Sequence, residues 1–221
     1  MRLILFDIDG TLLECGPQVR PILTETLVEI FGRIGNIDRY DLSGRTDPRI
    51  ALDLLMEAGL SELEILARLP EVRTKYAERL ERELDGERMR LLPGVSETLE
   101  SLARRKDVVL GLVTGNWEPG ARTKLSRFDL NRFFDFGAFG CDGVERSDLP
   151  PVALERAERI TGRSFRPEEA LIVGDTIHDV ACGKAHGIPV LAVATGRTTA
   201  ETLREGGADR VVADLTEIAD W

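Results

Sequence analysis

The sequence predicts an α/β protein, a doubly wound parallel sheet with a Rossmann-like core into which an all-helical cap is inserted. Apolar stretches of strand length alternate with helical patterns after residue 92, and this alternation is typical of a parallel sheet. The stretch from residue 17 to residue 92 holds helical patterns and no convincing strand. We therefore expect a core domain of residues 1–14 and 92–221, and a helical cap domain of residues 15–91.

The first strand, expected at residues 3–6, runs directly into two acids, Asp7 and Asp9, followed by Gly10 and Thr11. Because strand side chains repeat with period two, both carboxylates are expected on one side of the strand end. Two carboxylates this close to each other resist being ionised at the same time unless a cation lies between or beside them. A hard metal ion that prefers oxygen ligands is the natural partner.

The inserted segment is expected to be helical because its apolar residues recur at helical spacing. Proline near a helix start and glycine after a helix end mark several boundaries. Four helices are expected, at residues 17–32, at 48–59, from a capping box of Ser61 and Glu64 onward, and at 70–84.

The second part of the chain returns to alternation. Near-continuous apolar runs such as 108–113 are typical of strands that are covered on both faces. Strands are expected at 108–113, 136–139, 170–173, 190–194 and 210–212, and helices at 96–105, 119–128, 151–161, from 177 to Gly187, and at 199–205.

Composition narrows the function classes. Lys and Arg number 29 against 39 Asp and Glu, a net charge of −10, so we expect no nucleic-acid partner. No apolar run approaches the ~20 residues of a membrane span, so we expect no membrane partner and a cytoplasmic protein. Cys15, Cys141 and Cys182 are odd in number and lie at no metal-binding spacing, so no disulfide framework is expected.

Three polar clusters follow apolar strands. In an open parallel sheet, ligands bind beyond the carboxyl ends of the strands, so clusters far apart in sequence can converge there. Each cluster alone is explained by a strand-ending turn or a helix cap. Together they predict one site, made of Asp7 and Asp9, Thr114–Asn116, and Asp175 with Asp179.

These clusters carry a resemblance. Asp7–Thr11 is similar to the opening DxDGT motif of the haloacid dehalogenase-like hydrolase superfamily, Thr114 to its second motif, and Gly174–Asp179 to its acidic GDxxxD motif. The order of core elements and the cap inserted after the first motif also match. The chain resembles the phosphatase branch, and its layout is similar to that of phosphoglycolate phosphatases.

The resemblance implies roles for the acids. Asp7 is the expected nucleophile, which forms an aspartyl-phosphate. Asp9 is the expected acid and base, which protonates the leaving alcohol and later deprotonates water. Mg²⁺ is the expected cofactor, held by Asp7, the main-chain carbonyl of Asp9 and Asp175, with Asp179 oriented from nearby. The expected substrate is a small phosphorylated metabolite, with phosphoglycolate as one possibility.

The phosphoryl oxygens are expected to bind Thr114 and the amides around Gly115 and Asn116. The family places a lysine in its third motif, but the matching position here is Arg146. An arginine keeps the positive charge and can bind two phosphate oxygens. Lys124 is the competing candidate, although its place within a helix favours an ordinary solvated lysine.

One cap residue and two other functions stay open. Arg45, in the loop before the second cap helix, could contact substrate, or could instead pair with Asp47 or a neighbouring helix. A sugar phosphomutase similar to β-phosphoglucomutase is an alternative, because the same core can return the phosphoryl group to a sugar. A non-enzymatic phosphate-responsive binding module is a second alternative, although such a module needs neither a cap nor Asp9.

Overall fold

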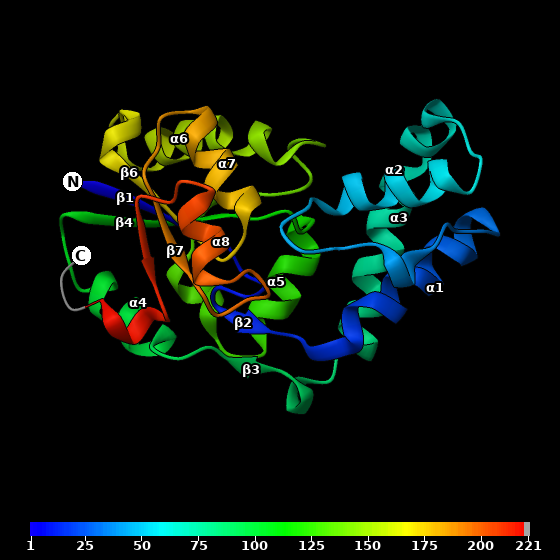
Figure 1. Ribbon diagram of the computed structural model, residues 1–221, viewed down its shortest axis with the longest axis horizontal. Helices are drawn as coiled ribbons and strands as arrows, with labels where there is room; N and C mark the ends of the chain where they lie inside the picture. Colours follow the sequence, from blue (N-terminus) through cyan, green and yellow to red (C-terminus); the bar gives the residue numbers. More distant parts are fainter. Residues whose placement is uncertain (219–221) are drawn as a thin grey trace.

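A six-stranded parallel sheet, described together with the rest of residues 1–218 in a computed structural model, forms the core of the protein (Figure 1). At its centre, Phe6 pairs with Leu112 on one side and with Val173 on the other. The three central strands therefore end level with one another, and the fold class predicted from the sequence is confirmed. In spatial order the strands are β5 (Gly137–Ala138), β4 (Val108–Val113), β1 (Arg2–Phe6), β6 (Ala170–Gly174), β7 (Val190–Val193) and β8 (Arg210–Val212).

Helices cover both faces of this sheet because alternate residues of each strand enter different apolar clusters. Ile4 and Phe6 of β1 pack with α4 (Val95–Ala103) and α5 (Glu118–Ser126). Leu3 and Leu5 of the same strand belong to the opposite cluster, with the helices that follow β5, β6 and β7. Those helices are α6 (Leu149–Thr161), α7 (Ile177–Ala185) and α8 (Ala200–Glu205).

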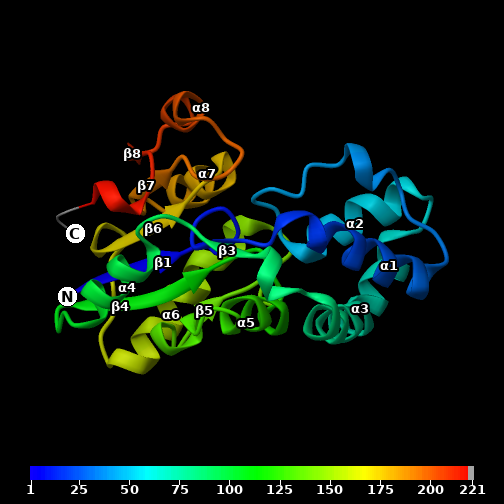
Figure 2. The ribbon, with the colours of Figure 1, turned by 90° about the horizontal axis from the view of Figure 1, so that it is seen from below.

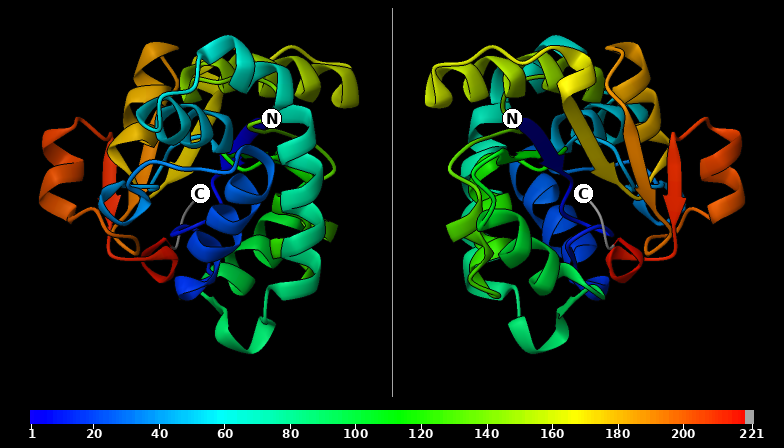
Figure 3. Two further views of the ribbon diagram at one scale, coloured as in Figure 1. Left: turned by 90° about the vertical axis from the view of Figure 1, so that its right-hand side faces the viewer. Right: turned by 90° about the vertical axis from the view of Figure 1, so that its left-hand side faces the viewer.

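The inserted helices lie together beyond one end of the sheet (Figure 2). They are α1 (Val19–Phe31), α2 (Asp47–Glu57) and α3 (Glu62–Glu83). Figure 3, on its left, views the protein from this side, with α3 beside α1. The cap and core share an apolar cluster, in which the ring of Tyr76 on α3 lies 5.9 Å from that of Trp117 at the start of α5.

The prediction of separate third and fourth cap helices is wrong. They form the single helix α3, with Pro70 inside it. Proline removes one backbone hydrogen bond from a helix, but the buried face continues past it. Ile65, Val72, Tyr76 and Leu80 are buried along that face, so packing holds the helix together where local preference favours a break. Ser61 does cap its start, since the side chain accepts from the amide of Glu64 at 3.3 Å.

The expectation of no strand between residues 17 and 92 is also wrong in one place. The two-residue strand β3 (Arg90–Leu91) pairs antiparallel with β2 (Leu13–Glu14). The chain thus leaves and re-enters the core through adjacent segments. The division into a core and a cap at residues 14/15 and 91/92 stays a prediction. Within residues 1–218, no helix combines the length and apolar character that a bilayer crossing requires.

Candidate active site

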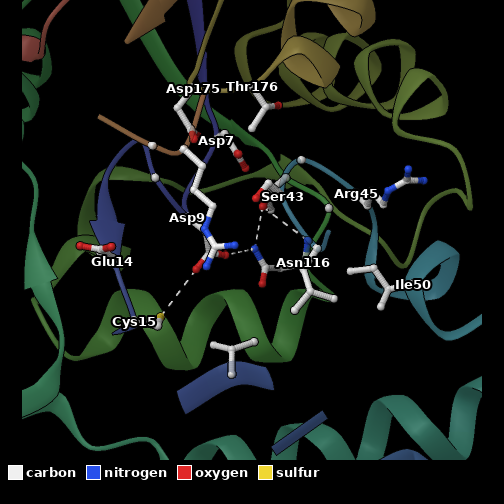
Figure 4. Close-up of a pocket in the computed structure, with 18 of the residues that line it drawn as sticks. Asp7, Asp9, Glu14, Cys15, Ser43, Arg45, Ile50, Asn116, Asp175 and Thr176 are labelled. Atoms are coloured by element: carbon white, nitrogen blue, oxygen red, sulfur yellow. Dashed lines mark hydrogen bonds between the residues drawn. The ribbon is translucent and has the colours of Figure 1, made fainter. Parts of the chain in front are cut away.

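Three strand ends bring the predicted clusters together. Asp7 follows β1, Thr114 follows β4 and Asp175 follows β6, and these strands are direct neighbours. The amide of Asp7 extends the ladder by donating to Val173 O at 2.9 Å. The convergence expected from the sequence is therefore present, and Figure 4 shows Asp7, Asp9 and Asp175 at one side of a shared pocket.

Asp7, Asp175 and Asp179 form a buried acid cluster. One carboxylate oxygen from each lies within 4.8 Å of the others. Burial raises the pKa of Asp7 to about 6, against the attraction of Arg146 and with further repulsion from Asp179 and Asp9. Burial, together with repulsion from Asp179 and Asp7, raises the pKa of Asp175 to about 8. The three carboxylates of the cluster thus carry more negative charge than the surrounding protein groups neutralise.

Arg146 is the cation inside this cluster. Its guanidinium lies 3.1 Å from Asp7 Oδ2 and forms an ion pair with Asp179, and its side chain is 7% exposed. One guanidinium facing two carboxylates, with a third acid beside them, leaves an excess of negative charge. The third-motif position that sequence spacing indicated is therefore occupied by a buried cation in contact with the expected nucleophile.

Asp179 is oriented by a capping box at the start of α7. One of its oxygens accepts from the Thr176 amide at 3.0 Å and from the Thr176 hydroxyl at 2.6 Å, and that hydroxyl accepts from the Asp179 amide at 3.2 Å. The other oxygen faces Arg146. This box was not among the features predicted from the sequence, although a threonine three residues before an acid at a strand end is its signal.

The cluster fits a hard divalent cation. All three side chains offer carboxylate oxygens, the donors that Mg²⁺ and similar ions prefer. Thr11 fixes one of them by donating to Asp175 Oδ1 at 3.0 Å. The raised pKa values of Asp7 and Asp175 show that a further positive charge is favourable here. The carboxylate of Asp9 is not part of this group, and whether its main-chain carbonyl is a ligand stays a prediction.

Asp9 has a separate set of partners. Its Oδ2 accepts from Lys124 Nζ at 2.6 Å and from Asn116 Nδ2 at 2.8 Å, and its Oδ1 accepts from the Cys15 thiol at 3.6 Å. Figure 4 shows the contacts with Cys15 and Asn116. Burial raises the pKa of Asp9, but Lys124 and these hydrogen bonds lower it more, so the net shift is downward. Asp9 is therefore already neutralised by the protein.

The interpretation of Lys124 as a solvated helix residue is wrong. Its side chain is only 2% exposed, and its ammonium group also donates to Asn116 Oδ1 at 2.6 Å. Its position in the sequence indicates burial, because Lys124 shares the buried face of α5 with Ala121 and Leu125. A lysine among buried helix positions requires a partner, and here that partner is the second acid of the opening motif.

Two of the predicted phosphate-binding residues, Thr114 and Gly115, contact different parts of the protein. Thr114 is fully buried, and its hydroxyl oxygen accepts from Asn116 Nδ2 at 2.9 Å. Asn116 therefore connects Thr114 with the Asp9 and Lys124 pair. Gly115 packs against the cap, because a Cβ there would lie 2.2 Å from Arg45 O. The main chain can approach this closely only without a side chain.

The cap loop lines a pocket of about 350 Å³ together with Asp7, Asp9 and Asp175. Arg45 lines it as well, but its guanidinium lies 3.6 Å from Asp53 on α2 and 5.3 Å from the centre of the Tyr40 ring. Figure 4 shows Arg45 directed away from Asp7 and Asp175. Of the partners considered from sequence, the neighbouring helix is the one observed, and a substrate contact stays a prediction.

Asp47, at the start of α2, is a pocket residue that the sequence indicated only as a possible partner of Arg45. Its carboxylate accepts from the Trp117 amide at 2.7 Å, and its own amide donates to Gly115 O at 2.8 Å. Burial raises the pKa of Asp47 to about 6, in spite of the attraction of Lys124. Asp47 thus ties the cap to the end of β4.

Comparison with known proteins places the chain in a family. Residues 4–193 match the family described as haloacid dehalogenase-like hydrolase. The chain is 29% identical over 223 residues to phosphoglycolate phosphatase 1 of Pseudomonas aeruginosa, across 98% of this chain and 78% of that protein. It is 28% identical over 216 residues to a phosphorylated carbohydrates phosphatase of Thermotoga maritima, across 96% of this chain and 94% of that one.

Solved structures agree on the fold. CbbY from Rhodobacter sphaeroides in complex with phosphate aligns with a TM-score of 0.72 at 21% identity, across 99% of this chain and 97% of that one. A haloacid dehalogenase-like family hydrolase from Streptococcus pneumoniae aligns with a TM-score of 0.67 at 20% identity, across 99% and 96%.

The chain therefore belongs to the haloacid dehalogenase-like hydrolase family, as its motifs indicated. Within that family it is a phosphatase, because its phosphatase relatives align with nearly all of it.

Proposed function

We propose that this phosphatase is a Mg²⁺-dependent phosphomonoesterase that hydrolyses a small phosphorylated metabolite through an aspartyl-phosphate on Asp7. One observation carries the proposal. Asp7 lies in a buried acid cluster that contains Arg146 and fits a divalent cation, while Asp9 lies beside it with its own cation, Lys124. A nucleophile and a proton-transfer group are thus held in different electrostatic surroundings in one pocket, as two-step phosphoryl transfer requires.

In the first half of the reaction, an oxygen of Asp7 attacks phosphorus, the bond to the alcohol breaks, and Asp9 gives its proton to that leaving oxygen. In the second half, Asp9 takes a proton from water, which attacks the same phosphorus and releases phosphate and Asp7. The proton that Asp9 donates is therefore recovered. The Lys124 pair favours the anionic form of Asp9, which is the form that the second half uses.

Asp7, Asp175 and the main-chain carbonyl of Asp9 would hold Mg²⁺, with Asp179 close by, and the bound ion would supply positive charge to the acids and the phosphoryl oxygens. Arg146 supplies a fixed positive charge beside Asp7. The Thr114 hydroxyl and the amides around Gly115 and Asn116 would donate hydrogen bonds to the phosphoryl oxygens.

The pocket supports a small substrate. About 350 Å³ between cap and core accommodates a metabolite, and the contacts of Asp47 with Gly115 and Trp117 close the cap over it. Closure excludes water from the phosphoryl group. Phosphoglycolate is a candidate, because an aligned relative is a phosphoglycolate phosphatase. The net charge of −10 supports the absence of a nucleic-acid partner.

The first test is phosphate release from p-nitrophenyl phosphate and from phosphoglycolate, with Mg²⁺ and with EDTA. We expect activity that EDTA abolishes and Mg²⁺ restores, and a loss of about 1,000-fold or more in Asp7→Asn, which lacks the nucleophile. Equal activity of Asp7→Asn and wild type would overturn the mechanism.

Two other outcomes point to the alternative functions. Conversion of glucose 1-phosphate to an isomer without release of phosphate would favour the sugar phosphomutase. Stable phosphorylation of Asp7 without turnover would favour the phosphate-responsive binding module.

A further inference from the structure

The pocket extends well beyond the acid cluster. Its lining includes Asp7, Asp175 and Arg146, where the proposed function places the phosphoryl group, as well as cap residues and a core loop after β7. That loop, Thr195–Arg197, comes from none of the sequence motifs and received no role in the sequence analysis. It contributes the arginine Arg197 to the pocket lining.

Four arginines line the pocket, and three of them already have protein partners. Arg146 pairs with Asp7 and Asp179. Arg45 lies near Asp53 and over Tyr40. Arg20 donates to the main-chain oxygens of Ile37 and Tyr40. The fourth is Arg197, which is exposed and makes no hydrogen bond or ion pair with any other residue in the range 1–218. None of its guanidinium donors has a partner within the described residues.

The loop that carries Arg197 is fixed against the catalytic residues. The Thr195 hydroxyl donates to Gly10 O at 2.5 Å, directly after the opening acids. Gly196 packs onto Asp175, since a Cβ there would lie 1.7 Å from Asp175 Oδ2. The main chain one residue before Arg197 is therefore in contact with a predicted metal ligand. The side chain of Arg197 therefore starts beside the phosphoryl end of the pocket that it lines.

Arg197 also influences an acid on the cap, Asp41. Burial raises the pKa of Asp41, but hydrogen bonds from Ser43 and the charges of Arg197 and Arg45 lower it more. Arg197 and Asp41 thus sense each other, although they form no ion pair within 4.0 Å in the described part of the chain.

We propose that Arg197 is a specificity-determining residue, which binds a second anionic group, a carboxylate or a phosphate, on the phosphomonoester substrate. The inference rests on the proposed function, because it takes the phosphoryl group to lie at the acid cluster. Arginine suits this role, since its planar fork binds two oxygens of either anion. Substrates with a neutral tail leave Arg197 without a partner and are expected to bind more weakly.

The experiment compares matched substrates that differ in the tail. Phosphoglycolate is paired with 2-hydroxyethyl phosphate, and glucose 1,6-bisphosphate with glucose 1-phosphate, with p-nitrophenyl phosphate as reference. Steady-state kcat and KM are measured for wild type, Arg197→Ala, Arg197→Lys and the exposed control Arg104→Ala. Wild type is expected to prefer an anionic tail. Arg197→Ala is expected to lose about 10- to 100-fold in kcat/KM on that substrate, mainly through KM, as for one charge-assisted hydrogen bond.

The control substrates make the outcome decisive. Activity of Arg197→Ala on p-nitrophenyl phosphate and on neutral-tail substrates is expected to stay within about twofold of wild type. Arg197→Lys is expected to recover part of the preference. An equal loss on all substrates would overturn the proposal, because it would assign Arg197 to cap closure through Asp41. So would a wild type that turns over p-nitrophenyl phosphate but shows no preference for either anionic tail. If no substrate is turned over with Mg²⁺, the proposed function itself fails.

Discussion

The two buried cations of the site, Arg146 and Lys124, neutralise acids in different ways. Arg146 faces Asp7 and Asp179 with Asp175 close by, and the pKa values of Asp7 and Asp175 are still raised to about 6 and about 8. Lys124 faces Asp9 alone, and the pKa of Asp9 is lowered. The first group therefore has an excess of negative charge that suits a divalent cation, whereas the second is balanced without one.

The acids next to the two cations also differ in how far their side chains are exposed to solvent. The Asp7 and Asp179 side chains are 5% and 1% exposed, while that of Asp9 is 41% exposed. If its cation is removed, a carboxylate that water can reach is solvated, but a buried one is left uncompensated. The two cations are therefore expected to contribute differently to stability.

The largest effect is expected for Arg146→Met. This change leaves three buried carboxylates without their cation, so the free energy of unfolding without metal should fall by about 3–5 kcal/mol. Phosphatase activity should fall by at least about 100-fold, because a fixed charge beside the nucleophile is lost. Urea unfolding followed by circular dichroism, with EDTA and with Mg²⁺, measures the first effect, and p-nitrophenyl phosphate turnover measures the second.

Mg²⁺ separates charge from packing in this variant. Added Mg²⁺ should recover part of the stability that Arg146→Met loses, because the ion supplies positive charge to the same acids. The exposed Arg104→Met serves as the matched control and should change neither quantity. A loss of stability that Mg²⁺ leaves unchanged would show that Arg146 acts through packing.

Lys124→Met is expected to have a smaller effect on stability and a selective effect on catalysis. The free energy of unfolding should fall by only about 1–2 kcal/mol, because Asp9 remains accessible to water. We expect kcat for p-nitrophenyl phosphate to fall by about 10- to 100-fold, since Asp9 loses the contact that orients it. KM should change little, because Lys124 does not line the pocket.

The comparison fails if Lys124→Met destabilises the protein as much as Arg146→Met does. It also fails if Lys124→Met raises KM and leaves kcat unchanged, which would assign Lys124 to substrate binding. The exposed Lys106→Met is the control for loss of a lysine as such.

The sequence was sufficient for the parts of the site that strand geometry dictates. Asp7, Thr114 and Asp175 each follow a strand of a parallel sheet, and neighbouring strands with matched register bring such residues together. Arg146 followed from its position relative to the third motif. The fold class was predictable for the same reason, since alternating strands and helices leave few other arrangements.

Residues whose role depends on tertiary contacts were not predictable in this way. Lys124 was interpreted from helical position, but its neutralisation by Asp9 requires knowing how α5 faces β1. Pro70 predicts a boundary between two helices, but packing of the Ile65 to Leu80 face keeps α3 continuous. Asp47 has its partners on a loop 70 residues away along the chain. In each case the contact that decides the outcome joins segments that are distant in the sequence, and no local sequence pattern shows how those segments pack together.

Asp47 extends the comparison to an acid without a cation of its own. It forms no ion pair within the described residues 1–218, and burial raises its pKa from 3.8 to about 6. Below pH 3.8 the carboxyl is protonated both folded and unfolded, and between the two values the folded state binds more protons. Its contribution to stability is therefore fully present at low pH and is lost as the pH rises through about 6.

Asp47→Asn isolates this smallest effect, because the amide keeps an oxygen for the Trp117 amide and cannot ionise. The difference between the folded and unfolded pKa values of Asp47 corresponds to a change in stability of at most about 3 kcal/mol. We expect relaxation of the cap loop to reduce this change to about 1 kcal/mol. From pH 4 to pH 7, the free energy of unfolding of wild type should therefore fall by about 1 kcal/mol relative to the variant. Urea unfolding of both proteins across this range measures the difference. If the difference in unfolding free energy between wild type and Asp47→Asn does not change with pH, Asp47 is neutralised within the protein, as Asp9 is. Lys124 would then be the cation that neutralises both acids.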